Sequence, residues 1–160
     1  MKKIILVLCL ILFFCFDICA IDVVQPKSQN AAAEDFTLTD LSGNDISLSG
    51  FHDKSFILFF WTTWCPHCRR VLSNFKDEYE NLKNEGIELL AIDVNESKER
   101  VESFVSKNSI IYPVLLDLDG EVSKKYSVLG VPTVILINKE GGIVSVAHDL
   151  PSDYKSLLFE

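Results

Sequence analysis

The sequence is poor in glycine, proline and positive charge. It has 7 glycines and 5 prolines in 160 residues, which excludes collagen-like and proline-rich disordered proteins. Lysine and arginine together number 15 against 23 aspartates and glutamates, and no basic tract offsets the formal charge of −8. This deficit argues against nucleic acid or an anionic membrane surface as the main partner. With 48% hydrophobic residues, the chain can form one compact domain with a buried core, and two independent domains are not expected.

No apolar run reaches the roughly 20 residues that a membrane-spanning helix normally needs. The longest run is 4–16, which follows two lysines and precedes Asp17, a pattern typical of a signal peptide. We predict that residues 1–20 are a signal peptide cleaved after Ala20 or, because Ile18 is bulky for such a site, a retained N-terminal membrane anchor. Residues 21–33 are predicted to be a linker and 34–160 a folded domain. The domain is therefore expected to be exported, to the periplasm or the outer face of the cytoplasmic membrane.

Cysteine is scarce once this leader is set aside. Three of the 5 cysteines lie within the leader, so the exported part carries only Cys65 and Cys68. A disulfide between residues this close closes almost no loop and would stabilise the fold little. A structural zinc site normally needs four side-chain ligands, and the distant His52 and His148 do not complete one. The pair therefore indicates chemistry, and no metal or cofactor is predicted beyond a redox-active disulfide between the two cysteines.

The spacing of apolar residues predicts alternating strands and helices. Segments 36–38 and 46–48 flank turn-forming residues and predict a hairpin, while the continuous aromatic run 56–61 is typical of a strand buried on both faces. The later elements are expected as a helix at 66–85, a strand at 87–94, a helix at 98–108, an extended segment at 113–116, a short helix at 120–126, strands at 133–137 and 143–147, and a short helix at 152–159. This order predicts an α/β protein with the thioredoxin fold: a central mixed sheet flanked by helices, with an N-terminal β-hairpin extension.

The two cysteines lie where the buried strand leads into the first helix. Cys68 follows Cys65 by one helical turn, which brings the sulfurs within disulfide reach. Free N–H groups and the positive end of the helix dipole favour a thiolate on Cys65. Cys65 is therefore predicted to be the nucleophile and Cys68 the residue that resolves the mixed disulfide. Pro66 suits the first helical turn because its missing N–H is not needed there.

His67, between the cysteines, is a candidate for tuning the redox potential. A partially protonated imidazole would stabilise the Cys65 thiolate and so the reduced form, which makes the pair a stronger oxidant. The alternative is that His67 is an ordinary exposed residue of the helix. The dipeptide Pro66-His67 is also found in the periplasmic oxidant DsbA, so we predict a redox potential more oxidising than that of thioredoxin.

Several motifs resemble a known family. The segment Trp61-Thr62-Thr63-Trp64-Cys65-Pro66-His67-Cys68 and the segment Gly130-Val131-Pro132-Thr133 resemble the active site and the cis-proline loop of thioredoxin-like proteins. With 35–43, 94–97 and 138–141, they are more closely similar to the TlpA/ResA branch of exported thiol-disulfide oxidoreductases. The resemblance implies an enzyme that exchanges disulfides with thiol- or disulfide-containing envelope proteins and with a further redox partner.

The same resemblance implies where substrate binds. The Pro132 peptide bond would be cis and would expose the backbone of Val131 beside the cysteines, so that an extended substrate can pair with it. Trp64 would belong to an exposed platform around Cys65, whereas Trp61 is expected in the core. The alternative for Pro132 is a trans proline that begins a strand.

Two residues depart from the family pattern. Val71 stands where many cytochrome c maturation members carry an acidic residue, which places that specialised role in doubt. Phe59 stands where thioredoxin has a buried aspartate, so proton transfer to Cys68 must use another group or water. Glu96 is no obvious substitute, because it can equally lie in the solvated first turn of the second helix.

Three classes of function stay open at this point. The first is the TlpA/ResA-like oxidoreductase, from which a DsbA-like thiol oxidase differs only in redox potential. The second is a copper-binding chaperone with the thioredoxin fold, for which His148 is the candidate later histidine. The third is a peroxidase, suggested by Thr62 three residues before Cys65, although Leu58 stands where the peroxiredoxin pattern has proline.

Overall fold

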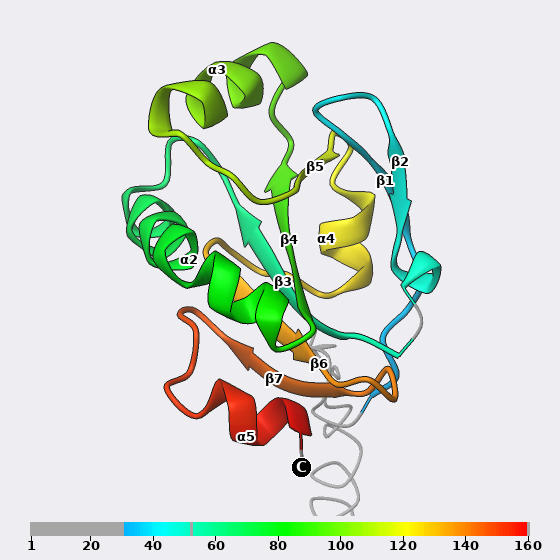
Figure 1. The fold of residues 1–160 in the computed structure, drawn as a ribbon. Helices are drawn as coiled ribbons and strands as arrows, with labels where there is room; N and C mark the ends of the chain where they lie inside the picture. Colours follow the sequence, from blue (N-terminus) through cyan, green and yellow to red (C-terminus); the bar gives the residue numbers. More distant parts are fainter. Residues whose placement is uncertain (1–30, 52, 160) are drawn as a thin grey trace, which may run out of the picture.

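A computed structural model of the protein describes residues 31–51 and 53–159 (Figure 1). The strands are β1 (Thr37–Asp40), β2 (Asp45–Ser47), β3 (Ser55–Trp61), β4 (Ile87–Val94), β5 (Val114–Asp117), β6 (Thr133–Ile137) and β7 (Ile143–Ala147). The helices are the 3-10 helix η1 (Leu48–Gly50) and the α-helices α2 (Pro66–Asn84), α3 (Lys98–Asn108), α4 (Glu121–Lys125) and α5 (Tyr154–Phe159). The predicted leader and residues 21–30 of the predicted linker lie outside this part. Within it, no helix has the length and apolar character required to cross a membrane.

The strands form one mixed sheet in the order β2-β1-β5-β4-β3-β6-β7. β4 lies parallel to β3 and to β5, while β6 is antiparallel to β3 and to β7. The predicted hairpin is β1 and β2, and β1 also pairs antiparallel with β5, so the hairpin extends the sheet. The structure thus confirms the predicted mixed sheet with its hairpin extension.

β3 is the buried centre of the sheet. All of its residues are buried, as expected for a strand with no polar face. On one face, Phe59 packs on Phe75 of α2 with ring centroids 5.3 Å apart, and Trp61 packs on Phe104 of α3 at 5.4 Å. Phe60 faces the other side of the sheet. The end of β3 that leads to the cysteines is therefore held by apolar contacts from two helices.

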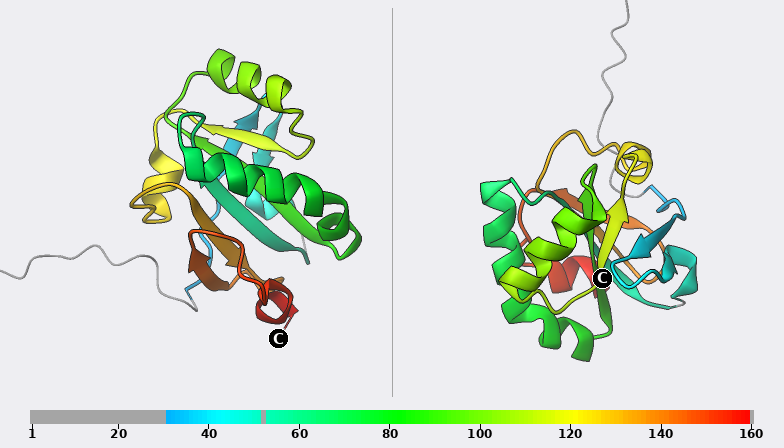
Figure 2. Two further views of the ribbon diagram at one scale, coloured as in Figure 1. Left: turned by 90° about the vertical axis from the view of Figure 1, so that its left-hand side faces the viewer. Right: turned by 90° about the horizontal axis from the view of Figure 1, so that it is seen from above.

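Helices cover both faces of the sheet (Figure 2). α2, α3 and α5 share a core with the Phe59 face of β3, and α4 shares a second core with the Phe60 face. In that second core, Tyr126, which directly follows α4, lies 6.0 Å from both Phe60 and Phe36, measured between ring centroids. The loop from α4 to β6 therefore begins at a buried residue, Tyr126, that fixes its position.

The first described residues lie at the end of the sheet opposite the cysteines. Ala33 donates a hydrogen bond to Gly141 at 2.8 Å, and Ala32 forms an antiparallel bridge with Gly142. Both glycines belong to the turn between β6 and β7. Because β6 is antiparallel to β3, this turn lies beside the beginning of β3, whereas Cys65 follows its end.

Asp117 links β5 to α4. Its buried carboxylate accepts the N–H of Val122 at 3.1 Å through Oδ1 and the N–H of Ser123 at 2.8 Å through Oδ2. These N–H groups lie in the first turn of α4, where helical partners are missing. Asp117 thereby positions the helix that precedes the loop containing Pro132.

Asp117→Asn is expected to lower the free energy of unfolding by about 1–3 kcal/mol, because the amide group would turn an N–H toward one of these two donors. Urea unfolding followed by circular dichroism measures the change. The matched control is Asp119→Asn. Asp119 is exposed and accepts one N–H, that of Glu121 at 3.1 Å, which an asparagine oxygen can also accept. Equal losses in both variants would contradict the assigned role of Asp117.

Candidate active site

Cys65 and Cys68 form a disulfide at the beginning of α2, with their Cα atoms 5.3 Å apart. Cys65 is the N-cap residue of this 19-residue helix, and its sulfur accepts the N–H of Cys68 at 3.1 Å. Cys68 is fully buried, whereas 4% of Cys65 is exposed. The helix N-terminus and its N–H groups favour a thiolate on Cys65 when the disulfide is reduced.

The loop before β6 approaches the same sulfur. The Val131–Pro132 peptide bond is cis. The carbonyl oxygen of Val131 lies 3.8 Å from the Cys65 sulfur. Within the loop, the Thr133 hydroxyl donates to the Gly130 carbonyl at 2.7 Å. The structure therefore brings Val131 and Pro132 beside the cysteines, although 66 residues separate Val131 from Cys65.

A groove of about 360 Å³ is lined by residues of the loop that precedes Cys65 and of the loop that precedes Pro132. Trp64 is 60% exposed at this groove, while Trp61 is buried in the core. Leu129 is 73% exposed and was not singled out from the sequence, although it directly precedes the Gly130-Val131-Pro132 motif. The other residues that line the groove are Thr62, Val94, Asn95, Ser123, Val128, Gly130 and Val131.

His67 contacts a carboxylate that the sequence did not indicate. Its Nε2 lies 2.9 Å and 3.0 Å from the two carboxylate oxygens of Asp149, which follows β7. The preceding residue, His148, donates from Nδ1 to the Pro132 carbonyl at 2.8 Å. The segment after β7 therefore contacts both the CxxC helix and the proline loop. His52 lies outside the described residues.

His148 was the candidate histidine for copper binding. Its Nδ1 already donates a hydrogen bond to the Pro132 carbonyl, 2.8 Å away. In residues 31–51 and 53–159, no group of three or more histidine, cysteine, aspartate or glutamate side chains is arranged to hold a metal ion.

Thr63, two residues before Cys65, is held by three charged side chains. The Glu96 carboxylate accepts the Thr63 N–H and, at 2.7 Å, the Thr63 hydroxyl. Arg100 lies 2.7 Å from Glu96 and donates to the Thr63 hydroxyl at 3.0 Å, while Arg69 donates to the Thr63 carbonyl at 2.9 Å and 3.2 Å. Glu96 is buried, so the alternative that placed it in a solvated helical turn is wrong. Its interaction with Thr63 fixes the loop that leads to Cys65.

Asp93 lies beside this network at the end of β4. It is 1% exposed, and neither carboxylate oxygen receives a hydrogen bond from the described residues. Burial, with a further contribution from the neighbouring Glu96, raises the pKa of Asp93 to about 8. The sequence offered one signal for this residue, an acidic side chain inside the apolar run of Ile87–Val94.

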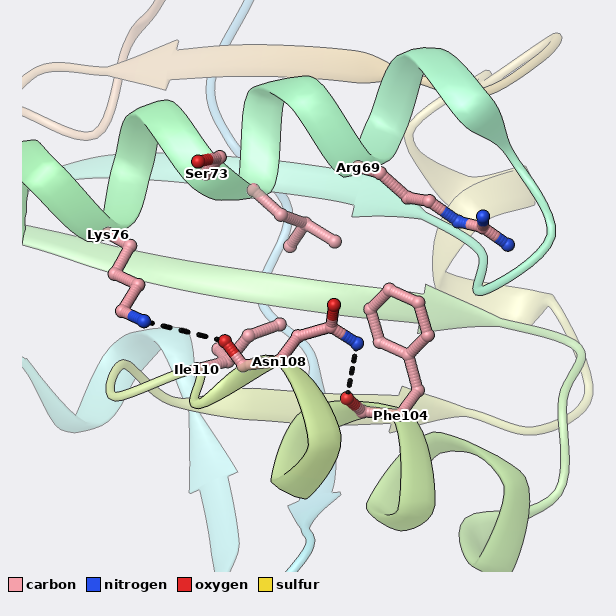
Figure 3. Close-up of a pocket in the computed structure, with 7 residues that line it drawn as sticks. Arg69, Ser73, Lys76, Phe104, Asn108 and Ile110 are labelled. Carbon is pink, nitrogen blue, oxygen red and sulfur yellow. Dashed lines mark hydrogen bonds between the residues drawn. The ribbon is translucent and has the colours of Figure 1, made fainter.

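A separate hollow of about 120 Å³ lies between α2 and α3 (Figure 3). Figure 3 shows Arg69 and Phe104 at one end of it, where the Arg69 guanidinium lies 5.8 Å from the centre of the Phe104 ring. At the other end, Lys76 donates to the Asn108 carbonyl at 3.5 Å. No cysteine lines this hollow. Arg69, which lines this hollow, also belongs to the Thr63 network, but the hollow is not the redox site.

Residues 30–146 match the AhpC/TSA family. The chain is 35% identical over 136 residues to the thiol-disulfide oxidoreductase ResA of Bacillus subtilis, a match that covers 82% of this chain and 76% of ResA. It is 37% identical to ResA of Bacillus thuringiensis subsp. konkukian over 70% of this chain, and there it spans 65% of the relative's length. The crystal structure of StoA from Bacillus subtilis superposes with a TM-score of 0.66 at 29% identity, covering 79% of this chain and 96% of StoA.

Thr63→Val is expected to lower the free energy of unfolding by about 1.5–3 kcal/mol, because the Thr63 hydroxyl bonds to two charged groups. Urea unfolding of the oxidised protein provides the measurement. Thr62→Val is the matched control, since the buried Thr62 hydroxyl has no hydrogen-bond partner among the described residues. That variant should be at least as stable as the wild type, because it removes a buried hydroxyl that has no partner. If Thr63→Val were as stable as Thr62→Val, the Thr63 network would not restrain the loop.

Proposed function

The chain belongs to the AhpC/TSA family and is a thiol-disulfide oxidoreductase similar to ResA, and we propose that it exchanges disulfides with proteins of the cell envelope through Cys65 and Cys68. One observation carries the assignment of roles. The Cys65 sulfur is the N-cap acceptor of α2, and Cys65 is the less buried of the two cysteines. Cys65 is therefore the nucleophile and Cys68 the resolving residue.

The reaction begins with the reduced pair. The Cys65 thiolate attacks one sulfur of a substrate disulfide, which forms a mixed disulfide and releases the other substrate sulfur as a thiolate. Cys68, deprotonated, then attacks the Cys65 sulfur, which restores the Cys65–Cys68 disulfide and releases the second substrate thiol. Two electrons pass from the cysteine pair to the substrate. In the reverse direction the same steps oxidise a substrate dithiol. A further redox partner then returns the cysteine pair to its starting redox state.

The groove beside Cys65 supports binding of an extended protein segment. Trp64 and Leu129 offer exposed apolar surface on either side, and the Val131 carbonyl lies near the reacting sulfur. Apolar side chains of the substrate would pack on the first two residues, while the substrate backbone would lie along the loop before Pro132. This arrangement favours a protein substrate over a small-molecule disulfide.

The first described residues lie at the end of the sheet opposite Cys65, where Ala32 forms a bridge with Gly142 in the turn between β6 and β7. If residues 1–20 serve as an anchor, the domain would be tethered from that end. If they are cleaved as a signal peptide, the same site acts on soluble envelope proteins.

The direction of electron flow depends on the redox potential, which His67 is placed to influence. His67 is the second residue of α2 and is 39% exposed beside the Asp149 carboxylate. When protonated, its imidazole adds positive charge at the helix N-terminus near the Cys65 thiolate. Because this charge stabilises the reduced form, the pair would be more oxidising than thioredoxin.

Cys68→Ser is expected to accumulate mixed disulfides with envelope proteins, because Cys65 can still attack but no second thiol resolves the product. Cys65→Ser should accumulate none, since the remaining Cys68 is fully buried. Non-reducing electrophoresis of alkylated cell extracts, followed by mass spectrometry, detects the complexes. Equal trapping by both variants would contradict the assignment of Cys65 as the nucleophile.

His67→Gln is expected to make the disulfide easier to form at pH 6, by roughly tenfold in its equilibrium with glutathione, or about 30 mV. Equilibration against glutathione buffers gives the potential. Arg70→Gln is the matched control, because it removes a charge from an exposed residue of the same helix that lies beyond the second cysteine and should change the potential less. An unchanged potential of His67→Gln would rule out tuning by the imidazole.

A further inference from the structure

Asp93 is a buried acid that the disulfide exchange described above does not use. It lies on β4 between Trp61 of β3 and Leu116 of β5, the residues that pair with it in the sheet. Neither neighbour carries a charge. An ionised carboxylate at such a site, without a hydrogen-bond donor, would be strongly destabilising. The site therefore requires either a neutral acid or a partner.

Glu96 provides that partner. Its carboxylate already accepts hydrogen bonds from the Thr63 N–H and the Thr63 hydroxyl, and it forms an ion pair with Arg100. A carboxylate has about four acceptor positions, so it can accept from a further donor. The Asp93 and Glu96 side chains interact, and two carboxyl groups can share a hydrogen bond only when one of them holds a proton. Since Arg100 pairs with Glu96, the negative charge is better placed on Glu96 and the proton on Asp93.

We propose that Asp93 is a positioning residue: as a neutral acid it donates a hydrogen bond to Glu96 and keeps the Glu96 carboxylate on Thr63, and so fixes the loop that presents Cys65. The role of Cys65 as nucleophile rests on the proposed function above. The chain of contacts is short, because Glu96 binds both polar groups of Thr63 and the Cys65 N–H donates to the Thr62 carbonyl at 3.3 Å.

The charged groups that face this region come from two helices. Glu96 and Arg100 belong to the beginning of α3 and the residues before it, and Arg69 extends from α2 to the Thr63 carbonyl. The positive charge of Arg100 lowers the pKa of Asp93, whereas burial raises it, and the pKa of Asp93 still lies near 8. At higher pH, Asp93 and Glu96 would both be negative, and the repulsion would weaken the hold on Thr63.

The effect on stability has a defined sign. The pKa of Asp93 is raised from its ordinary value of 3.8 to about 8 in the folded protein. Between these values the unfolded chain has released the proton and the folded protein retains it. Stability therefore decreases as pH rises through this window and becomes level above it.

The test compares Asp93→Asn, Asp93→Leu and the wild type, with Glu102→Gln as the control that removes an exposed carboxylate from α3. Asparagine can still donate to Glu96 but does not titrate, and leucine does neither. Urea unfolding of the oxidised proteins is measured from pH 5 to 9. The rate at which the reduced proteins react with oxidised glutathione is measured over the same range.

We expect the unfolding constant of the wild type, relative to Asp93→Asn, to increase by up to about tenfold per pH unit between pH 5 and 8. Glu102→Gln should follow the wild type. In the exchange reaction, Asp93→Asn should equal the wild type within about twofold at pH 7 and exceed it severalfold at pH 9. Asp93→Leu should be about tenfold slower at pH 7, because Glu96 loses its hydrogen-bond donor.

Identical pH profiles of the wild type and Asp93→Asn would overturn the proposal. A changed unfolding profile with an unchanged exchange profile would also overturn it, because Asp93 would then be only a structural residue. If Asp93→Asn were as slow as Asp93→Leu at pH 7, donation to Glu96 would not be its role. If the wild type did not react with oxidised glutathione while the unfolding profiles diverged as expected, the Asp93–Glu96 pair would stand and the proposed function would fail.

Discussion

The hydrogen bond from the Cys68 N–H to the Cys65 sulfur is the interaction on which the redox site depends. It requires Cys65 to occupy the N-cap of α2, at the point where the chain leaves a buried strand and enters a helix. At this position, the helix N–H groups and the helix dipole act on the Cys65 sulfur, whereas Cys68 is enclosed in the core. The chemical difference between two identical side chains thus comes from their position at a helix end.

Holding Cys65 at that point requires the rest of the domain. β3 is fixed by aromatic side chains from α2 and α3 on one face and by Tyr126 on the other. Tyr126 also begins the loop that returns through Val131 to the cysteines. The same core that buries β3 therefore aligns two loops that lie far apart in the sequence, and a groove forms beside them.

Polar groups complete the site at a cost in stability. Burial of Asp93 and Glu96 is unfavourable unless each has a partner, and Glu96 has its partners in Thr63 and Arg100. On the more exposed side, Asp149 pairs with His67 and brings the segment after β7 against the CxxC helix. One carboxylate thus contacts the loop before Cys65, and another contacts the residue between the cysteines.

Local patterns were enough to predict the strands, the helices, the hairpin and the CxxC pair at the beginning of α2. These features depend on residues within a few positions of one another, such as the continuous apolar run of β3 and the helical spacing that follows Pro66. The family resemblance added the cis bond at Pro132. Partners of Thr63 and His67 could not be predicted in this way, because 33 residues separate Thr63 from Glu96 and 82 separate His67 from Asp149. Only the tertiary structure brings Glu96 to Thr63 and the segment after β7 to α2, and burial together with the neighbouring Glu96 raises the pKa of Asp93.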